Sequence, residues 1–351
     1  MTEAGRPGNG AGGRIAGPAP RSATDVLGSL AGKVASGEVL GYQPLSLGLG
    51  ALDRSIGGGI RPGDLVLIGG AQGTGKTTLA LQMARNLVAS GQASVLFVCY
   101  EHDEEYLLNR LIAMESVVET LPETGGGLKL TDVRKEILAT TAAGGGPGDL
   151  GANPRLRPLL DRVAGYGSRL FLLRGSPTET GVREVGELVR GFREATGDRR
   201  LVVFVDYLQK IPVLPEPPSE TEKVTASVSG LKELALGLEV PVVSIVAADK
   251  EGLKAQRLRH HHLRGSSAID YEADIILILN EKYSIVAKVA IEYNPHAAQR
   301  FRDWVVLTVE KNRSGQNAVD LELEKYFAWS CFHPEARPVQ EKLVEERLYN
   351  D

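Results

Sequence analysis

A glycine-rich segment that ends in lysine and threonine is the strongest chemical signal in the sequence. Residues 70–77 read Gly-Ala-Gln-Gly-Thr-Gly-Lys-Thr and match the pattern G-x-x-x-x-G-K-[S/T]. Backbone N–H groups of such a loop turn inward around phosphates, and the helix that follows adds a partial positive charge. Lys76 is placed to reach the β- and γ-phosphates, and the Thr77 hydroxyl to ligate Mg²⁺. The predicted phosphate-binding residues of an Mg-ATP site are Gly70, Gly73, Thr74, Gly75, Lys76, Thr77 and Thr78.

The context of this segment decides between a nucleotide site and a chance glycine-rich turn. An apolar run at 65–69 precedes it, and a helical pattern at 77–90 follows it. Strand, loop and helix in that order are what the phosphate-binding mechanism requires. The placement therefore favours the nucleotide site, with Lys76 as a catalytic residue.

Two carboxylates follow apolar runs and are expected to converge on this loop. Asp206 closes the run at 201–205, and Glu101 follows the run at 95–100. Ligands of open α/β sheets bind at the carboxyl ends of the strands. Asp206 is predicted to be the Mg²⁺ partner, either directly or from the outer coordination sphere. Glu101 is predicted to orient and deprotonate the attacking water; the alternative is a solvated residue in an acidic run.

Apolar runs alternate with helical patterns from residue 45 onward, and these elements must position the site. Continuous rather than alternating apolar runs are typical of parallel strands buried on both faces. The alternation predicts an α/β fold, a mostly parallel twisted sheet flanked by helices. Residues 319–324 alternate between apolar and acidic side chains, which predicts a half-exposed edge strand. The predicted buried strands lie at 65–69, 95–100, 170–173, 201–205, 240–246, 275–279 and 305–309.

The two ends of the chain differ from this central part. Residues 1–22 are rich in Gly and Pro and are expected to form a disordered tail. A helix is predicted at 24–37, within a linker that spans residues 23–44. The ATPase domain is placed at 45–333, with a flexible loop at 141–155 and a C-terminal tail at 334–351.

Charge and cysteine content limit the classes of function. The net charge is −4 over 351 residues, so no overall basic field attracts nucleic acid. The two cysteines, Cys99 and Cys331, lie too far apart in sequence for a disulfide framework or a cysteine-based zinc site. No run approaches the roughly 18 consecutive apolar residues of a membrane span, and no signal peptide is evident. We expect a cytoplasmic protein that does not enter the membrane.

Several segments together resemble the RecA-like ATPase domain of DnaB-type replicative helicases. The resemblance covers about residues 45–330, and it is specific because the motifs occur jointly. Only residues 1–44 precede it, so the primase-binding N-terminal domain of those helicases is not expected here. The segments that carry the resemblance are Leu-Ser-Leu-Gly-Leu-Gly-Ala-Leu-Asp at 45–53, Arg-Pro-Gly-Asp-Leu-Val-Leu-Ile at 61–68, Asp-Tyr-Leu-Gln at 206–209, residues 263–275, and Lys-Asn-Arg-Ser-Gly at 311–315.

The resemblance implies a homo-oligomeric ring, hexameric in the family, with ATP bound between subunits. In the family the cations of the K-x-R segment reach into the neighbour's site and stabilise transition-state charge. That role is carried over to Lys311 and Arg313; the alternative is a solvated β-turn. The helix before the core docks on the next subunit in the family, a role that residues 24–37 are placed to take.

One departure from the family leaves a second function open. The glutamine that senses the γ-phosphate in the family is replaced here by Ala247. The stretch at 249–252 and the Lys-Asn-Arg segment also resemble RadA-type recombination ATPases. The alternative function is therefore a KaiC-like or RadA-like ATPase that switches an assembly or an unknown protein partner without helicase activity.

A basic segment at 250–264 is the candidate for single-stranded DNA. In the family this loop lines the central channel, where a ring of such loops attracts a single-stranded backbone. The segment lacks an aromatic residue for base stacking, and a mobile basic surface loop is the alternative. Its three successive histidines do not share one helix face and are not expected to bind metal. The predicted nucleic-acid contacts are Lys250, Lys254, Arg257, Arg259 and Arg264.

Overall fold

The computed structural model describes residues 20–37, 43–118, 126–142, 150–198, 200–286 and 299–344. The chain divides into two units, Met1–Gly41 and Tyr42–Asp351. The described part of the first unit is helix α1 (Ala23–Ala35), which begins with a capping box between Ser22 and Asp25 and buries none of its residues. The predicted helix at 24–37 is thus confirmed. Most of the predicted disordered tail, residues 1–19, lies outside the described residues.

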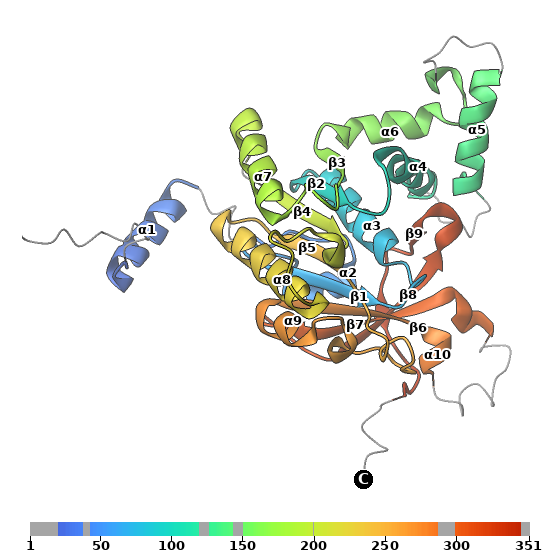
Figure 1. The fold of residues 1–351 in the computed structure, drawn as a ribbon. Coiled ribbons are helices and arrows are strands. Elements are labelled where there is room, and N and C mark those ends of the chain that lie inside the picture. The colour runs from blue at the N-terminus through green and yellow to red at the C-terminus, as the bar shows by residue number, and fades with distance from the viewer. Residues whose placement is uncertain are drawn as a thin grey trace, which may run out of the picture. The chain divides into compact units, whose positions relative to one another are not determined.

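The second unit is built on one twisted sheet (Figure 1). Its strands lie in the order β10-β8-β7-β6-β1-β5-β4-β2-β3, and β9 pairs with β8. The strands are β1 (Leu65–Gly70), β2 (Ser94–Cys99), β3 (Leu170–Arg174), β4 (Leu201–Asp206), β5 (Val242–Ala247), β6 (Ile275–Glu281), β7 (Trp304–Asn312), β8 (Val319–Tyr326), β9 (Cys331–Phe332) and β10 (Arg337–Pro338).

The strands from β6 to β3 in this order run parallel, as their apolar runs predict. The run at 170–173 is wrong as a buried strand, because β3 lies at the edge of the sheet and Phe171 is 37% exposed. β1 lies at the centre, with Val66 opposite Val243 on one side and Ile275 on the other. Each residue of β1, β2 and β4 is buried, because helices cover both faces. The predicted α/β class with a mostly parallel sheet is confirmed. The carboxyl ends of β1, β2 and β4 therefore meet at one edge of the sheet, as the site requires.

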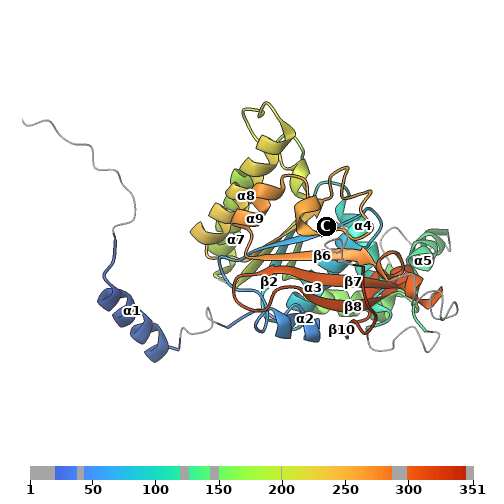
Figure 2. The same cartoon turned by 90° about the horizontal axis from the view of Figure 1, so that it is seen from below.

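Two helical layers enclose the sheet. Helices α2 and α3 lie on one face, and α7, α8 and α9 lie on the other (Figure 2). Alternate residues of β1 enter the two cores, Val66 and Ile68 one of them, Leu65 and Leu67 the other. The helices are α2 (Gly50–Ser55), α3 (Lys76–Ala89), α4 (Glu104–Glu115), α5 (Leu130–Ala142), α6 (Arg157–Gly167), α7 (Val182–Thr196), α8 (Glu220–Gly237), α9 (Ser266–Glu272) and α10 (Lys282–Ile285), with 3₁₀ turns η3 (Leu150–Ala152), η4 (Leu208–Lys210), η5 (His260–His262), η6 (Phe301–Asp303) and η7 (Phe327–Trp329).

Helices α4, α5 and α6 gather beside α3 around a small core of their own (Figure 1). Val133 of α5 and Leu156 at the start of α6 are fully buried there. Part of the loop predicted at 141–155 is helical, since α5 ends at Ala142 and η3 covers Leu150–Ala152. Residues 143–149 of that prediction lie outside the described part of the chain.

The sheet differs from the prediction on the side of β8. Strand β7 pairs antiparallel with both β6 and β8, so its apolar run does not mark a parallel strand. β8 was expected at an edge, but β10 pairs on its outer side. Glu322 of β8 is buried and bonded to Lys282 and Arg337, partners that the alternating pattern cannot show.

The C-terminal residues also contact this part of the sheet. Val344 donates a backbone hydrogen bond to Ile285 at 2.8 Å, and Glu341 lies 2.7 Å from the buried Lys282 ammonium. Within the described ranges, no helix combines the length and apolar character needed to cross a membrane.

Candidate active site

The glycine-rich segment forms a tight turn between β1 and α3, as predicted. Gly70 ends β1, and Gly73 and Gly75 both adopt positive φ angles, +83° and +93°. A Cβ atom on Gly75 would lie 2.5 Å from Cζ of Phe327, so only glycine fits there. Thr74 is buried and donates to the Ala71 carbonyl at 2.9 Å. The turn leaves the first N–H groups of α3 facing the space above it.

Lys76 and Thr77 are the first two residues of α3, and their side chains point back to the turn and to β4. The Lys76 ammonium donates to the carbonyls of Gly70 and Ala71, both at 2.8 Å. Burial lowers the pKa of Lys76, while the charges of Asp206 and Glu101 oppose that effect. The Thr77 hydroxyl donates to Oδ2 of Asp206 at 2.8 Å. The structure therefore brings the phosphate loop and the first predicted carboxylate into direct contact.

Asp206 stands at the tip of β4 and is almost completely buried. Burial raises the pKa of its carboxyl to about 6, and the negative charge of Glu101 adds to this rise. The Thr77 hydrogen bond and the positive charge of Lys76 act in the opposite direction. A buried carboxylate with so little compensation has a strong preference for a cation beside it.

Glu101 follows β2 and is solvent-exposed. The predicted role of general base requires this access to water. Its negative charge raises the pKa of both Asp206 and Lys76, and the N–H of Tyr100, the residue before it, donates to the Asp206 carbonyl at 2.7 Å. β2 pairs with β4 so that Cys99 lies opposite Asp206. The neighbouring strands therefore position the two predicted carboxylates at one edge.

Arg110 of α4 also belongs to this site, and sequence reasoning did not identify it. Its guanidinium donates to the Thr78 hydroxyl at 3.0 Å and to the Tyr106 hydroxyl at 2.7 Å. Its positive charge lowers the pKa of Asp206. Tyr106 and Arg110 are four residues apart and share one helix face. This spacing points to the site only once the position of α4 beside the phosphate loop is known.

A second group missed from the sequence is an aromatic clamp behind the phosphate loop. Phe327 and Phe332 lie edge to face, 5.3 Å apart, against Gly75. The Gln82 amide of α3 donates to the Phe332 carbonyl at 2.9 Å and accepts from its N–H at 2.8 Å. This pair of hydrogen bonds joins α3 to β9 and thereby holds the phosphate loop, which leads into α3, in position.

Lys311 and Arg313 lie together, but away from the phosphate loop of their own subunit. Lys311, near the end of β7, donates to the Asp270 carbonyl, and Arg313 donates to Asp274 and to the Tyr271 carbonyl. Asp274 accepts from the Leu65 N–H at the start of β1. The phosphate loop begins at Gly70, at the other end of β1 and five residues after Leu65, a span of about 17 Å.

The five cations of the basic segment have different environments. Arg257 is 4% exposed and lies 2.6 Å from Asp320, so its guanidinium is engaged within the fold. Arg259 lies 2.6 Å from Glu310, and Arg264 pairs with Glu220. Lys250 and Lys254 are exposed and form no ion pair with other described residues. The two lysines are therefore the cations of this segment most open to an external phosphate.

Ala247, where the family has a glutamine, ends β5 directly beside the phosphate loop. Its Cα lies opposite Gly70 in the parallel pairing of β1 and β5. Its N–H donates to the side-chain oxygen of Gln209 at 3.1 Å. A glutamine side chain therefore contacts the position of Ala247, but it belongs to Gln209 of η4, three residues after Asp206.

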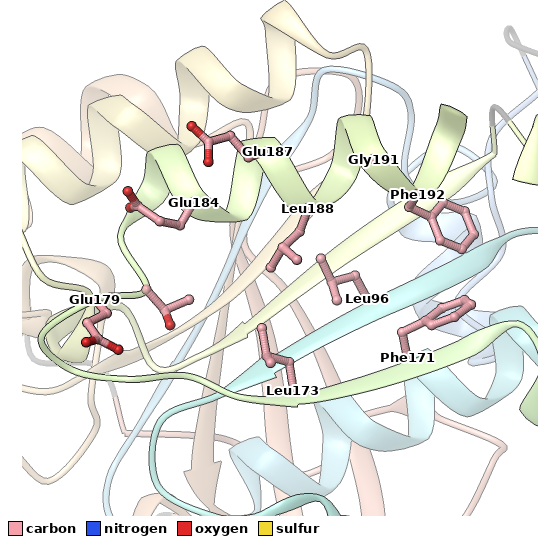
Figure 3. Close-up of a pocket in the computed structure, with 10 residues that line it drawn as sticks. Leu96, Phe171, Leu173, Glu179, Glu184, Glu187, Leu188, Gly191 and Phe192 are labelled. Carbon is pink, nitrogen blue, oxygen red and sulfur yellow. The ribbon is translucent and has the colours of Figure 1, made fainter. Parts of the chain in front are cut away.

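A groove of about 650 Å³ lies elsewhere, between the edge strand β3 and helix α7 (Figure 3). Phe171, Leu173 and Phe192 form its apolar lining, and Glu184 and Glu187 lie along one side. None of the predicted site residues lines this groove. The candidate active site is therefore defined by convergent polar groups and not by this groove.

Comparison with known proteins agrees with this geometry. The sequence model of the DnaB-like helicase C terminal domain matches residues 45–144 and 170–329. The replicative DNA helicase DnaB of Treponema pallidum is 28% identical over 240 residues, which cover 67% of this chain and 48% of that protein. DnaB of Pasteurella multocida is 28% identical over 68% of this chain and 46% of its own length. The DNA repair protein RadA of Synechocystis is 48% identical, but over only 60 residues.

Solved structures share the fold. One solved ATPase domain superposes with a TM-score of 0.68 at 19% identity, covering 90% of this chain and 99% of that one. A DnaB-like replicative helicase superposes with a TM-score of 0.66 at 18% identity, covering 90% of this chain and 67% of that one. The chain spans about half the length of the DnaB relatives named above. The long family match does not favour the KaiC-like or RadA-like alternative, and the chain belongs to the DnaB-like helicase C-terminal domain family.

Proposed function

We propose that this chain binds and hydrolyses Mg-ATP at the loop of residues 70–78. The observation that carries the proposal is the contact between the Thr77 hydroxyl and Asp206, with Lys76 and Glu101 beside it. A hydroxyl and a buried carboxylate are oxygen donors of the kind that Mg²⁺ prefers. The raised pKa of Asp206 supports the fit, because a cation at this position would relieve an uncompensated charge.

The residues divide the chemistry between them. Bound Mg²⁺ would neutralise charge on the β- and γ-phosphates. Lys76 would leave the Gly70 carbonyl and reach the γ-phosphate, and the loop N–H groups would hold the remaining oxygens. Glu101, exposed at the end of β2, would orient a water and accept its proton. Arg110 would orient the Thr78 hydroxyl, to which it already donates.

We propose further that the active form is a homo-oligomeric ring, with a hexamer expected. Arg313 is held by Asp274 at the start of β1, about 17 Å from the phosphate loop at its other end. Lys311 lies opposite Ile276, level with Leu67 and about 10 Å from Gly70 along the strand direction. Both side chains donate to carbonyls of α9, those of Asp270 and Tyr271, and among the described residues neither contacts the phosphate loop of its own subunit. They serve transition-state charge only if a neighbour presents its phosphate loop to them, which is what a ring provides.

The proposed ligand of the ring is single-stranded DNA. Lys250 and Lys254 are exposed on the segment 249–264, which is the basic segment 250–264 together with Asp249. Several copies of this segment around a central opening would attract a phosphate backbone. Arg257 is held by Asp320 and supports the fold of the segment more than it supports binding. We place the protein in the cytoplasm and leave the identity of any protein partner open.

The test is ATP hydrolysis with and without oligo(dT), at low and at moderate salt. Hydrolysis that depends on Mg²⁺ and is stimulated by DNA supports the proposal, with less stimulation at higher salt. Stimulation should decrease when Lys250 and Lys254 are both changed to alanine. Mass photometry with ATP measures the mass of the assembly, and a monomer at all nucleotide concentrations would refute the ring.

A further inference from the structure

Glu310 lies next to Lys311 at an irregular point of β7. In the pairing of β6 with β7, Ile276 lies opposite Lys311, whereas Leu277 lies opposite Val309. Glu310 is therefore the extra residue of a bulge and has no partner in β6. Bulges change the direction of the residues that follow them. The position of Glu310 thus sets the direction of the cations beyond it.

The carboxylate of Glu310 is buried, with 1% of its side chain exposed, and both its oxygens face the segment 249–264. One oxygen lies 2.6 Å from Nε of Arg259, and the other lies 2.9 Å from Nδ1 of His260. Burial alone would raise the pKa of Glu310, but His260 and Arg259 outweigh burial and lower it. The carboxylate is therefore charged, and its compensation comes from this segment.

The same segment is also joined to Asp270 of α9. Nε2 of His260 lies 3.8 Å from Oδ2 of Asp270, so the His260 imidazole lies between the carboxylates of Asp270 and Glu310. The backbone carbonyl of Asp270 accepts from the Lys311 ammonium. His260 is thus connected to Lys311 along two routes, through Glu310 and through Asp270.

Both ends of the segment lie beside the phosphate loop of the same subunit, whereas Arg259 and His260 lie in its middle. Ala248 pairs with Leu263, and the Arg264 N–H donates to the Ala247 carbonyl at 3.2 Å. Ala247 lies opposite Gly70, the first residue of that loop. The segment therefore spans from the subunit's own nucleotide position to the cations that a ring would present to its neighbour.

We propose that Glu310 is a positioning residue that couples the segment 249–264 to Lys311 and Arg313. The inference rests on the proposed function, because it concerns how DNA on this segment regulates the proposed inter-subunit site. A phosphate that draws Arg259 toward itself removes a partner from a buried carboxylate. Leaving a buried charge without compensation is unfavourable, so Glu310 shifts with Arg259 and carries the end of β7 with it.

The test compares Glu310→Gln with Asp320→Asn. Asp320 also holds the segment, through Arg257 at 2.6 Å, but it lies on β8, which does not carry the cations. Glutamine keeps the size of Glu310 and removes its charge. For Glu310→Gln we expect the ratio of kcat with oligo(dT) to kcat without it to fall toward unity. The KM for ATP should stay within roughly twofold, because no nucleotide contact changes. Asp320→Asn should retain the ratio.

Hydrogen–deuterium exchange with oligo(dT) separates the inference from the proposed function. In the wild type, DNA should change exchange in peptides covering 249–264 and in peptides covering 309–316. In Glu310→Gln it should change only the first set. If the wild type shows both changes yet hydrolyses no ATP, the proposed function fails and the coupling stands. If the wild type is stimulated by DNA and Glu310→Gln behaves identically, or if Asp320→Asn loses as much stimulation, the coupling is refuted.

Discussion

Replacing Asp206 with asparagine should make the nucleotide-free protein more stable at neutral pH while it removes activity. The carboxyl has its pKa raised from 3.8 to about 6, with burial as the main cause. At roughly 1.4 kcal/mol for each unit of pH, the charged form costs about 3 kcal/mol of folding free energy. The pKa of Asp206 is higher in the folded than in the unfolded protein. The contribution of this protonated carboxyl to the free energy of unfolding is therefore fully present below pH 3.8 and is lost as pH rises through about 6. Asparagine keeps an acceptor for the Thr77 hydroxyl and does not titrate.

The assay is urea denaturation of both proteins in EDTA, without nucleotide, from pH 4 to pH 8. The free energy of unfolding of Asp206→Asn relative to the wild type should rise by about 2 to 3 kcal/mol across this range, with most of the change between pH 4 and pH 7. Glu105→Gln, at an exposed site of the neighbouring helix α4, controls for the loss of one negative charge. Addition of Mg-ATP should stabilise the wild type and leave Asp206→Asn nearly unchanged. A difference between the two proteins that does not vary with pH would refute the account of Asp206 as a desolvated carboxylate.

Four further substitutions test the rest of the site. Lys76→Ala should abolish ATP hydrolysis, and wild-type turnover in this variant would disprove the assignment of the loop. Glu101→Gln should reduce kcat by about 10² to 10⁴ with little change in nucleotide affinity, so a large change in KM measured in the same assay would argue for a binding role instead. Gly75→Ala should lose binding of a fluorescent ATP analogue, because the new methyl group would lie 2.5 Å from Phe327; binding as tight as that of the wild type would contradict this account of the turn. Arg313→Ala should be inactive alone but regain activity when mixed with Lys76→Ala, since a mixed ring joins an intact loop to an intact Arg313; a mixture no more active than its components would exclude action between subunits.

The sequence was sufficient for the centre of the fold and of the site, because both depend on local patterns. Continuous apolar runs mark strands that are buried on both faces, and the residue that follows such a run lies at the edge where ligands bind. Asp206 and Glu101 were found in this way. The phosphate loop was found because its glycines, lysine and threonine occur within eight residues.

The features that the sequence could not supply depend on partners far along the chain. Arg257 reads as a free cation until Asp320, 63 residues later, is seen beside it. Glu310 likewise reads as an ordinary strand residue until His260 is placed against it, 50 residues away. Arg110 joins the site only because α4 crosses near the phosphate loop. Composition and periodicity do not record such pairings, so the basic segment looked more uniformly available to DNA than its contacts allow.

The aromatic clamp behind Gly75 has a consequence for how the protein is made. Gln82 and Phe332, which bond to each other twice, are 250 positions apart. A ribosome that adds roughly 5 to 20 residues per second delivers the second partner about 12 to 50 seconds after the first. The phosphate loop is thus one of the first parts of the domain to be synthesised and one of the last to receive its full support. Nascent chains should acquire nucleotide affinity only after β9 has left the exit tunnel.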